Sequence, residues 1–174
     1  QQLEFITDTT PQKRSPNLKA YRVPKYTIKL VREGVITVEP DQIRRETDLY
    51  RVAQTMLQEL DREHLIVIML DSKSRIIGAN VAAVGGLNFA YLDMKSIVKP
   101  AILCNAASIA LAHNHPSGDC TPSPEDVRLT ESIIAACKML DIDVLDHLVL
   151  ADNNPGVPMN FISLRERCLC TFNS

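Results

Sequence analysis

The sequence lacks several features that mark large classes of protein. Its 174 residues carry 19 Lys and Arg against 21 Asp and Glu, a formal net charge of −2, so there is no basic excess of the kind that attracts nucleic acid. No apolar run approaches the roughly 20 residues that a membrane-spanning helix needs. No internal repeat is visible. These absences predict no membrane partner, and the charge does not support direct nucleic-acid binding, although a local basic patch stays open.

Cysteine occurs in an odd number and without regular spacing. The chain has five cysteines, and no secretory signal with its charged start, apolar stretch and cleavage site precedes them. Thiols of this kind stay reduced in the cytosol. We therefore expect a cytoplasmic protein without a disulfide framework.

Length and composition favour one domain that is preceded by an additional N-terminal segment. With 45% hydrophobic residues, the chain can bury one core and is too short for two ordinary domains. Residues 1–20 have almost no apolar periodicity, which predicts a flexible or partner-bound tail. Residues 21–46 are predicted to form an N-terminal β extension, with strands over 26–32 and 35–39. The main domain is expected over residues 47–174.

Helices and strands are expected to alternate through this domain. Where apolar residues recur every three to four positions the pattern predicts an amphipathic helix, and short apolar runs bounded by turns predict strands. The predicted helices are 47–60, 93–105 and 123–140, and the predicted strands are 64–70, 75–84, 109–115, 143–151 and a short one near 161. Pro100 is expected to kink or split the second helix. The alternation predicts an α/β fold.

The stretch from His113 to Asp126 concentrates residues that can bind a metal ion. His113 and His115 end an apolar run, and a spacing of two places both imidazoles on one side of a strand. The chain then turns and restarts at Ser123 with a helix-start pattern, which places Asp126 at a rigid helix end. Two imidazole nitrogens and one carboxylate oxygen are a ligand set of catalytic zinc sites, whose fourth position is left for water.

Other interpretations of this stretch carry less weight. Each feature taken alone is more often a surface histidine or an ordinary helix start. The same ligand set binds iron in oxygenases, which we expect on all-β folds rather than between a strand and a helix. Zinc nucleobase deaminases need H-x-E and P-C-x-x-C, whereas this chain has H-x-H and the close pair Cys168-x-Cys170. Three adjacent letters, His-Asn-His, are too short to indicate an HNH nuclease.

The spacing of these residues also resembles a family signature. H-x-H, seven residues, Ser, two residues, Asp is the pattern of JAMM (MPN/Mov34) metalloproteases, and His113, His115, Ser123 and Asp126 meet every position. The segments LAHNHPSGD and LDH are similar to the RadC branch. The resemblance covers roughly residues 46–170. It implies a JAMM/MPN-like (cytidine-deaminase-like) mixed sheet flanked by helices.

The resemblance implies a zinc-dependent hydrolase of the metallopeptidase or isopeptidase type, acting on a protein or peptide substrate. Zinc would lower the pKa of a bound water, and Glu63, before a predicted strand, would act as general base and pass the proton to the leaving amine. Ser123 would donate to the oxyanion, while its residue type also predicts an N-cap, and both roles stay open.

A second function from another class stays open beside the hydrolase. RadC proteins have been labelled DNA-repair proteins, so a repair-associated or scaffold protein that uses the fold for binding is the alternative. The intact ligand positions weigh against a purely structural module. Nothing in residues 1–45 resembles the helix-hairpin-helix module that RadC proteins commonly carry, and this weighs against direct repair chemistry.

Three more residues are candidates for a role beside the metal, and a fourth is not. Cys120 stands where the family usually has Pro, which allows a fourth ligand or redox sensitivity, although an inert loop cysteine is the simpler expectation. Asp119 and Asp146 are candidates to orient a ligand. His147 is adjacent to Asp146, so it points to the opposite face of its strand and is expected outside the metal site.

Overall fold

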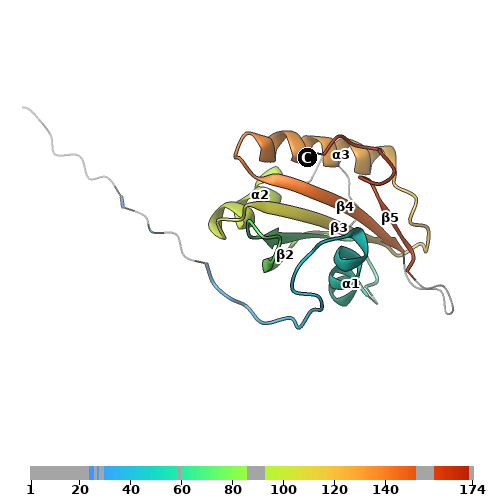
Figure 1. Cartoon of the computed structure of the whole chain (residues 1–174), viewed down its shortest axis with the longest axis horizontal. Helices are drawn as coiled ribbons and strands as arrows, with labels where there is room; N and C mark the ends of the chain where they lie inside the picture. The colour runs from blue at the N-terminus through green and yellow to red at the C-terminus, as the bar shows by residue number, and fades with distance from the viewer. Residues whose placement is uncertain are drawn as a thin grey trace, which may run out of the picture.

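One mixed sheet organises the molecule. The computed structural model describes residues 24–25, 27, 30–58, 60–85, 93–151 and 159–172. The strands are β1 (His64–Leu70), β2 (Ile76–Val84), β3 (Ser108–His115), β4 (Asp143–Ala151) and β5 (Phe161–Ser163), in the order β2-β1-β3-β4-β5 (Figure 1). β3 and β4 run parallel, and the other neighbours run antiparallel. The predicted α/β class with a mixed sheet flanked by helices is confirmed.

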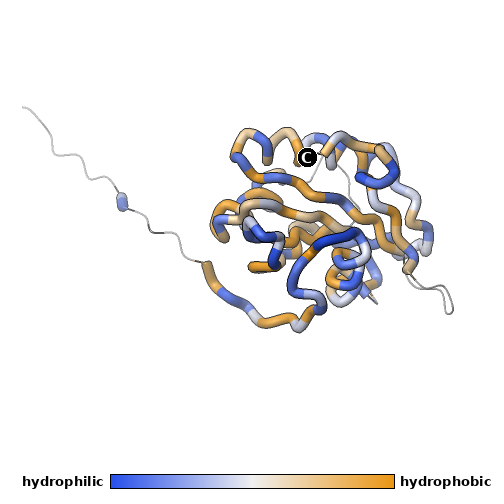
Figure 2. Tube along the Cα trace, viewed as in Figure 1, coloured by the Kyte–Doolittle hydropathy of each residue, from blue (hydrophilic) through white to orange (hydrophobic). Residues whose placement is uncertain are grey.

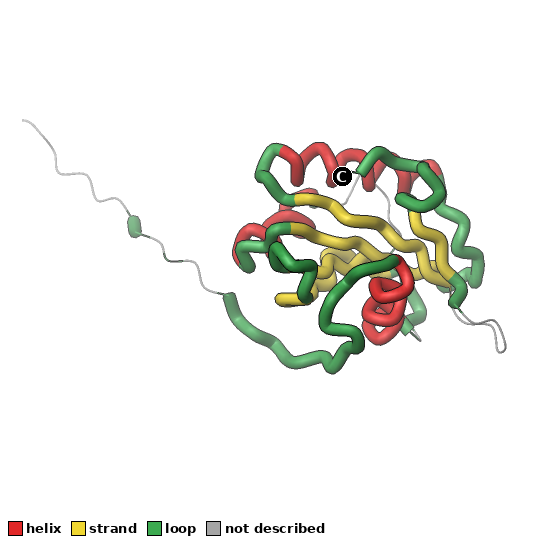
Figure 3. The backbone as a smooth tube through the Cα atoms, in the orientation of Figure 1, coloured by secondary structure: helices red, strands yellow, loops and turns green. Residues whose placement is uncertain are grey.

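Helices cover both faces of the sheet. Figure 3 shows them in red on opposite sides of the yellow strands. Helix α1 (Glu46–Leu57) packs on the face that carries Ile66, Ile68 and Leu70. Helices α2 (Met94–Leu103) and α3 (Pro124–Lys138) pack on the face that carries Leu65, Val67 and Met69. Successive side chains of β1 therefore serve two separate cores, as the period of two in a strand requires.

The central strands are buried on both faces. Orange dominates β3 and β4 in Figure 2, and Ile109, Ala110, Leu111 and Ala112 have no exposed surface. Burying a Leu or Ile side chain stabilises the fold by about 1.5–3 kcal/mol. Because this packed strand continues directly into His113, the first candidate ligand stands on a rigid element.

The element bounds agree with the predictions except at helix ends. The strands at 64–70 and 143–151 are found at those residues, whereas α1 ends at Leu57 and α3 ends at Lys138, short of the predicted ends. Of the kink or split predicted at Pro100, the split is not found, because α2 continues through this residue from Met94 to Leu103; the kink stays a prediction. A proline removes one hydrogen-bond donor, and the burial of Ile97, Val98 and Ala101 holds the helix together.

The predicted strand over residues 35–39 is not formed. The described residues 30–40 contain no strand, and the side chains of Val31 and Val35 are each 82% exposed. Gln42 makes one isolated bridge to Arg75 in the turn between β1 and β2. An alternating pattern gives a stable strand only when a partner and a face to bury are present. Residues 1–20, and part of 26–32, lie outside the described residues.

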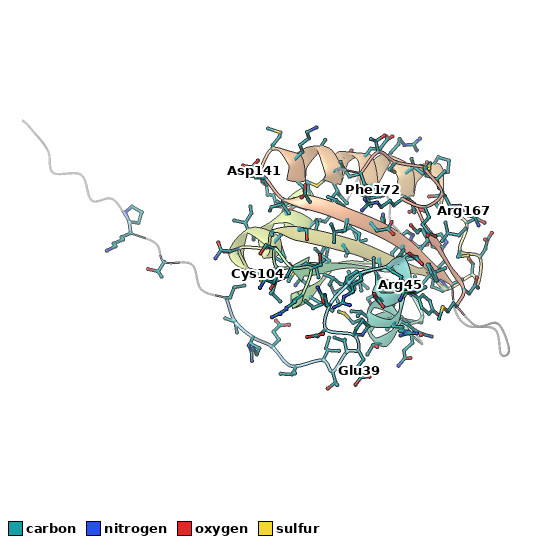
Figure 4. The ribbon with its side chains drawn as sticks, viewed as in Figure 1. Glu39, Arg45, Cys104, Asp141, Arg167 and Phe172 are labelled. Atoms are coloured by element: carbon teal, nitrogen blue, oxygen red, sulfur yellow. The ribbon has the colours of Figure 1, made fainter. Side chains whose placement is uncertain are left out.

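The C-terminal segment folds back beside α3. Phe172 and Cys170 pack against the core under α2 and α3, and Cys170 Sγ donates to the carbonyl of Val127 at 3.8 Å. Figure 4 shows Phe172 next to α3, with Glu39 at the lower edge of the molecule. In the part of the chain that the structure describes, no helix combines the length and the apolar character that a membrane crossing requires.

Candidate metal centre

Three side chains converge where β3 ends and α3 begins. His113 Nε2 and His115 Nε2 lie 3.0 Å apart. Asp126 Oδ1 lies 3.5 Å from His113 Nε2, and Asp126 Oδ2 lies 3.7 Å from His115 Nε2. The loop between the two elements, at the right-hand end of the sheet in Figure 1, brings the carboxylate back to the histidines. The predicted convergence is confirmed, and this group could hold a metal ion.

In both candidate histidines, the contact made by Nδ1 leaves Nε2 as the nitrogen that faces the centre of the site. His115 Nδ1 lies 2.7 Å from the backbone carbonyl of Asp119. A carbonyl oxygen only accepts, so Nδ1 carries the proton and the neutral ring keeps its lone pair on Nε2. His113 Nδ1 contacts His147 Nε2 at 2.8 Å, so that its Nε2 also faces inward. Electron pairs without a proton between them repel, and a cation would relieve this; two imidazoles and a carboxylate suit zinc.

Burial keeps the inner histidine neutral. His113 has no exposed surface, and this desolvation, with a smaller effect of neighbouring His115, lowers its pKa from 6.5 to about 3. Burial likewise lowers the pKa of His147 well below its ordinary value. An imidazole must be neutral to bind a metal ion. His113 therefore meets this condition throughout the neutral pH range.

Ser123 holds the carboxylate ligand in place. Its backbone N–H and its hydroxyl both donate to Asp126 Oδ2, at 2.8 and 2.7 Å, and Asp126 N–H donates back to Ser123 Oγ at 3.1 Å. This is a capping box, which the sequence Ser-Pro-Glu-Asp favours because Pro124 fits the first helical position. The hydroxyl proton of Ser123 points at a ligand. Its predicted role toward an oxyanion stays a prediction.

Glu63 reaches the same place from a distant part of the sequence. It precedes β1, and the antiparallel pairing of Leu65 with His113 carries it toward His115. One open pocket of about 400 Å³ unites the two segments. Its lining residues are Glu63, His115, Ser117, Asp119, Thr121, Ser123, Glu125 and Asp126. The structure thus places the predicted base on the rim of the predicted metal site.

Asn114, between the two histidines, fixes the backbone on both sides of Glu63. Its Oδ1 accepts from His64 N–H at 2.7 Å, and its Nδ2 donates to the carbonyl of Arg62 at 2.9 Å. The side chain points to the opposite face of β3 from His113 and is 2% exposed. Sequence reasoning missed this residue. The signal was a polar amide inside an apolar strand, because a buried amide must find partners.

Comparison with known proteins places the chain in a family. The family model of the RadC-like JAB domain matches residues 43–169. The chain belongs to the RadC-like JAB domain family. The match includes Glu63, the three converging residues and all of the described strands and helices.

Proteins called UPF0758 protein are similar to this RadC-like JAB domain. The one from Roseiflexus castenholzii is 45% identical over 128 residues, 74% of this chain and 52% of its own length. The one from Chloroflexus aggregans is 40% identical over 125 residues, 72% and 52%. The one from Methanococcoides burtonii is 37% identical over 133 residues, 76% and 56%. The chain spans about half the length of these relatives, whose names state no activity.

His147 is not one of the three converging residues, but it lies directly behind one of them, a contact that the sequence did not predict. It is fully buried and contacts His113, as given above, whereas Asp146 does not face the ligands. The Asp146 carboxylate accepts from Ser163 Oγ at 2.7 Å and from Arg165 N–H at 3.2 Å. Asp146 therefore ties β4 to the end of β5 and to the segment that follows it. Both residues are buried, although they face opposite sides of the strand.

Two residues of the loop between β3 and α3, Asp119 and Cys120, were candidates for a role beside the metal. Asp119 orients His115 through its backbone carbonyl, while its carboxylate accepts from Thr121 N–H at 2.8 Å. Cys120 Sγ donates to Asn160 Oδ1 at 3.3 Å and is not among the three converging ligands. Burial, as the largest effect, raises the pKa of the Cys120 thiol, so the reactive thiolate is disfavoured. The simpler expectation for Cys120 agrees with this geometry.

Proposed function

We propose that this RadC-like JAB domain is a zinc-dependent hydrolase that cleaves an amide bond in a protein or peptide substrate. The observation that carries the proposal is the convergence of three ligand atoms, from His113, His115 and Asp126, beside a pocket that His115, Asp126 and Glu63 line. His115 contributes a lone pair by virtue of its hydrogen bond to Asp119, and Ser123 fixes Asp126. A metal site with a carboxylate beside it is the constellation of metal-assisted hydrolysis.

Each residue has a defined task in the proposed reaction. A divalent ion held by His113, His115 and Asp126 would supply a water nucleophile at neutral pH. Glu63 would accept a proton from the attacking water and return it to the leaving amine. Ser123 also lines the pocket, so its hydroxyl would donate to the developing oxyanion when it turns from Asp126; one such donor contributes roughly 3 kcal/mol.

The charge of the pocket favours an amide substrate over nucleic acid. Its lining includes four carboxylates, from Glu63, Asp119, Glu125 and Asp126, and neither Lys nor Arg is among its lining residues. A phosphate backbone would meet repulsion at this surface, whereas a peptide carries no such charge. The repair-associated alternative predicts duplex binding that weakens steeply with salt. Flat or absent binding in a salt titration would remove that alternative.

Metal analysis combined with a peptide-library cleavage screen tests the proposal. Wild-type protein purified without chelator should contain zinc and cleave some library members. Glu63→Gln should keep the zinc and lose cleavage, because the amide is nearly isosteric but cannot accept the proton. Glu131→Gln, an exposed acid on α3, is the matched control and should behave as wild type. Full cleavage by Glu63→Gln would remove the base assignment.

A further inference from the structure

We propose that Thr130 and His147 form a hydrogen-bond relay that fixes His113 in the one tautomer able to bind a metal ion. The inference rests on the metal site proposed above and concerns two residues that the hydrolysis itself does not use. Both are fully buried, so water cannot replace any member of the relay. They would act as positioning residues, through His113.

The relay begins at a hydroxyl with two neighbours. Thr130 Oγ1 lies 2.6 Å from the backbone carbonyl of Asp126 and 2.6 Å from His147 Nδ1. A carbonyl only accepts, and a hydroxyl has one proton, so Thr130 donates that proton to Asp126. Toward His147 the hydroxyl can then only accept. His147 Nδ1 must therefore carry a proton.

The direction set at Thr130 passes through both rings. A neutral imidazole has one N–H, so His147 Nε2 is an acceptor once Nδ1 is protonated. His113 Nδ1, at 2.8 Å, must donate to it. The lone pair of His113 is thereby placed on Nε2, the atom that lies 3.0 Å from His115 Nε2. The two ring planes meet at 61° with centroids 4.9 Å apart.

If the hydrogen bonds of the relay ran in the reverse direction, His113 could not bind a metal ion. If Thr130 gave its proton to His147, the chain of bonds would end with a proton on His113 Nε2, and that proton would occupy the position of a cation. The hydroxyl would also lose its bond to the carbonyl of Asp126, the residue that supplies the third ligand. Thr130 thus couples two ligands. It reaches Asp126 through the backbone carbonyl of that residue, and it reaches His113 through His147. His115 needs no such relay, because the carbonyl of Asp119 fixes it directly.

The test is ¹⁵N NMR of the histidine rings in the metal-free full chain, with zinc affinity measured by competition with a chromophoric chelator. In wild type, His113 should carry its proton on Nδ1. Thr130→Val keeps the shape and removes the hydroxyl, so His113 should become a mixture of tautomers and zinc binding should weaken about 10- to 100-fold. Thr130→Ser should restore both. Thr55→Val, which loses a similar bond to Arg51 in α1, is the matched control and should change neither.

The spectra and the affinities separate the relay from the metal site. A wild-type His113 with its proton on Nε2 would overturn the relay, and so would an unchanged spectrum and affinity in Thr130→Val. The wild-type spectrum decides this even if Thr130→Val fails to fold. Wild-type protein with the expected tautomer and no zinc binding would instead overturn the proposed function and leave the hydrogen-bond assignment standing.

Discussion

The two faces of β3 hold the candidate site in different ways. On the α3 face, His113 is fixed by buried side chains, through His147. On the α1 face, the adjacent Asn114 fixes a backbone segment, by bonding on both sides of Glu63. The first arrangement determines where ligand electron pairs point, and the second determines where a carboxylate stands. Because His113 and Asn114 are consecutive residues of one rigid strand, the candidate metal ligands and Glu63 are held in a common frame.

The largest effect on zinc binding and cleavage is expected when a candidate ligand on the α3 face is removed. Asp126→Ala deletes the carboxylate and should abolish zinc binding, because only two protein ligands, the imidazoles, remain. Cleavage should be lost with the zinc. Metal analysis after purification without chelator measures this. Asp48→Ala removes an acid of the first turn of α1 that does not line the pocket, and this variant should retain the metal. Retained zinc in Asp126→Ala would contradict the assigned ligand set.

Removing the Asn114 side chain, on the α1 face of β3, should lower cleavage and leave zinc binding unchanged. Asn114→Ala frees the backbone around Glu63, and a displacement of about 1 Å can cost on the order of 100-fold in rate. We expect that loss in cleavage together with unchanged zinc content. Amide exchange at His64 should accelerate, which reports the lost bond directly. Asn80→Ala, at an exposed position of β2, is the control. A parallel loss of zinc would show that the two faces are not separable.

Acid should destabilise the metal-free protein because the buried histidines on the α3 face of the sheet are neutral in the folded chain. The pKa of His113 is about 3 in the folded chain against an ordinary 6.5, so between these values the unfolded chain binds one more proton. Stability is therefore lost as the pH falls from about 6.5 toward 3, by about 1.4 kcal/mol per unit for this ring. His147 acts in the same direction. Denaturant unfolding at several pH values, with His113→Gln giving a shallower slope, checks this.

The smallest effect is expected at the helix start. Ser123→Ala should lower the free energy of unfolding by about 1 kcal/mol, because an N-cap is lost. Asp93→Ala removes the cap of α2, where the carboxylate accepts from Lys95 N–H at 3.1 Å, and should cost about as much. Zinc affinity distinguishes the two, since the Ser123 hydroxyl also holds Asp126. Equal zinc affinity in both variants would reduce Ser123 to a helix cap.

The ligands were predictable because their geometry is local. A period of two in a strand and a helix start a few residues later are enough to bring His113, His115 and Asp126 together. Glu63 needed the family resemblance, since its own surroundings look like a solvated helix end. Asn114 and His147 could not be assigned, because their roles depend on contacts between distant strands. The failed strand over residues 35–39 has the same cause, since alternation in a sequence does not supply a partner.

Zinc content of the wild-type chain tests the central claim most directly. When the chain is supplied with zinc and purified without chelator, we expect about one zinc ion per chain. Glu63→Gln should keep this ion and Asp126→Ala should lose it. A wild-type chain that binds no zinc or other divalent ion under these conditions would contradict it.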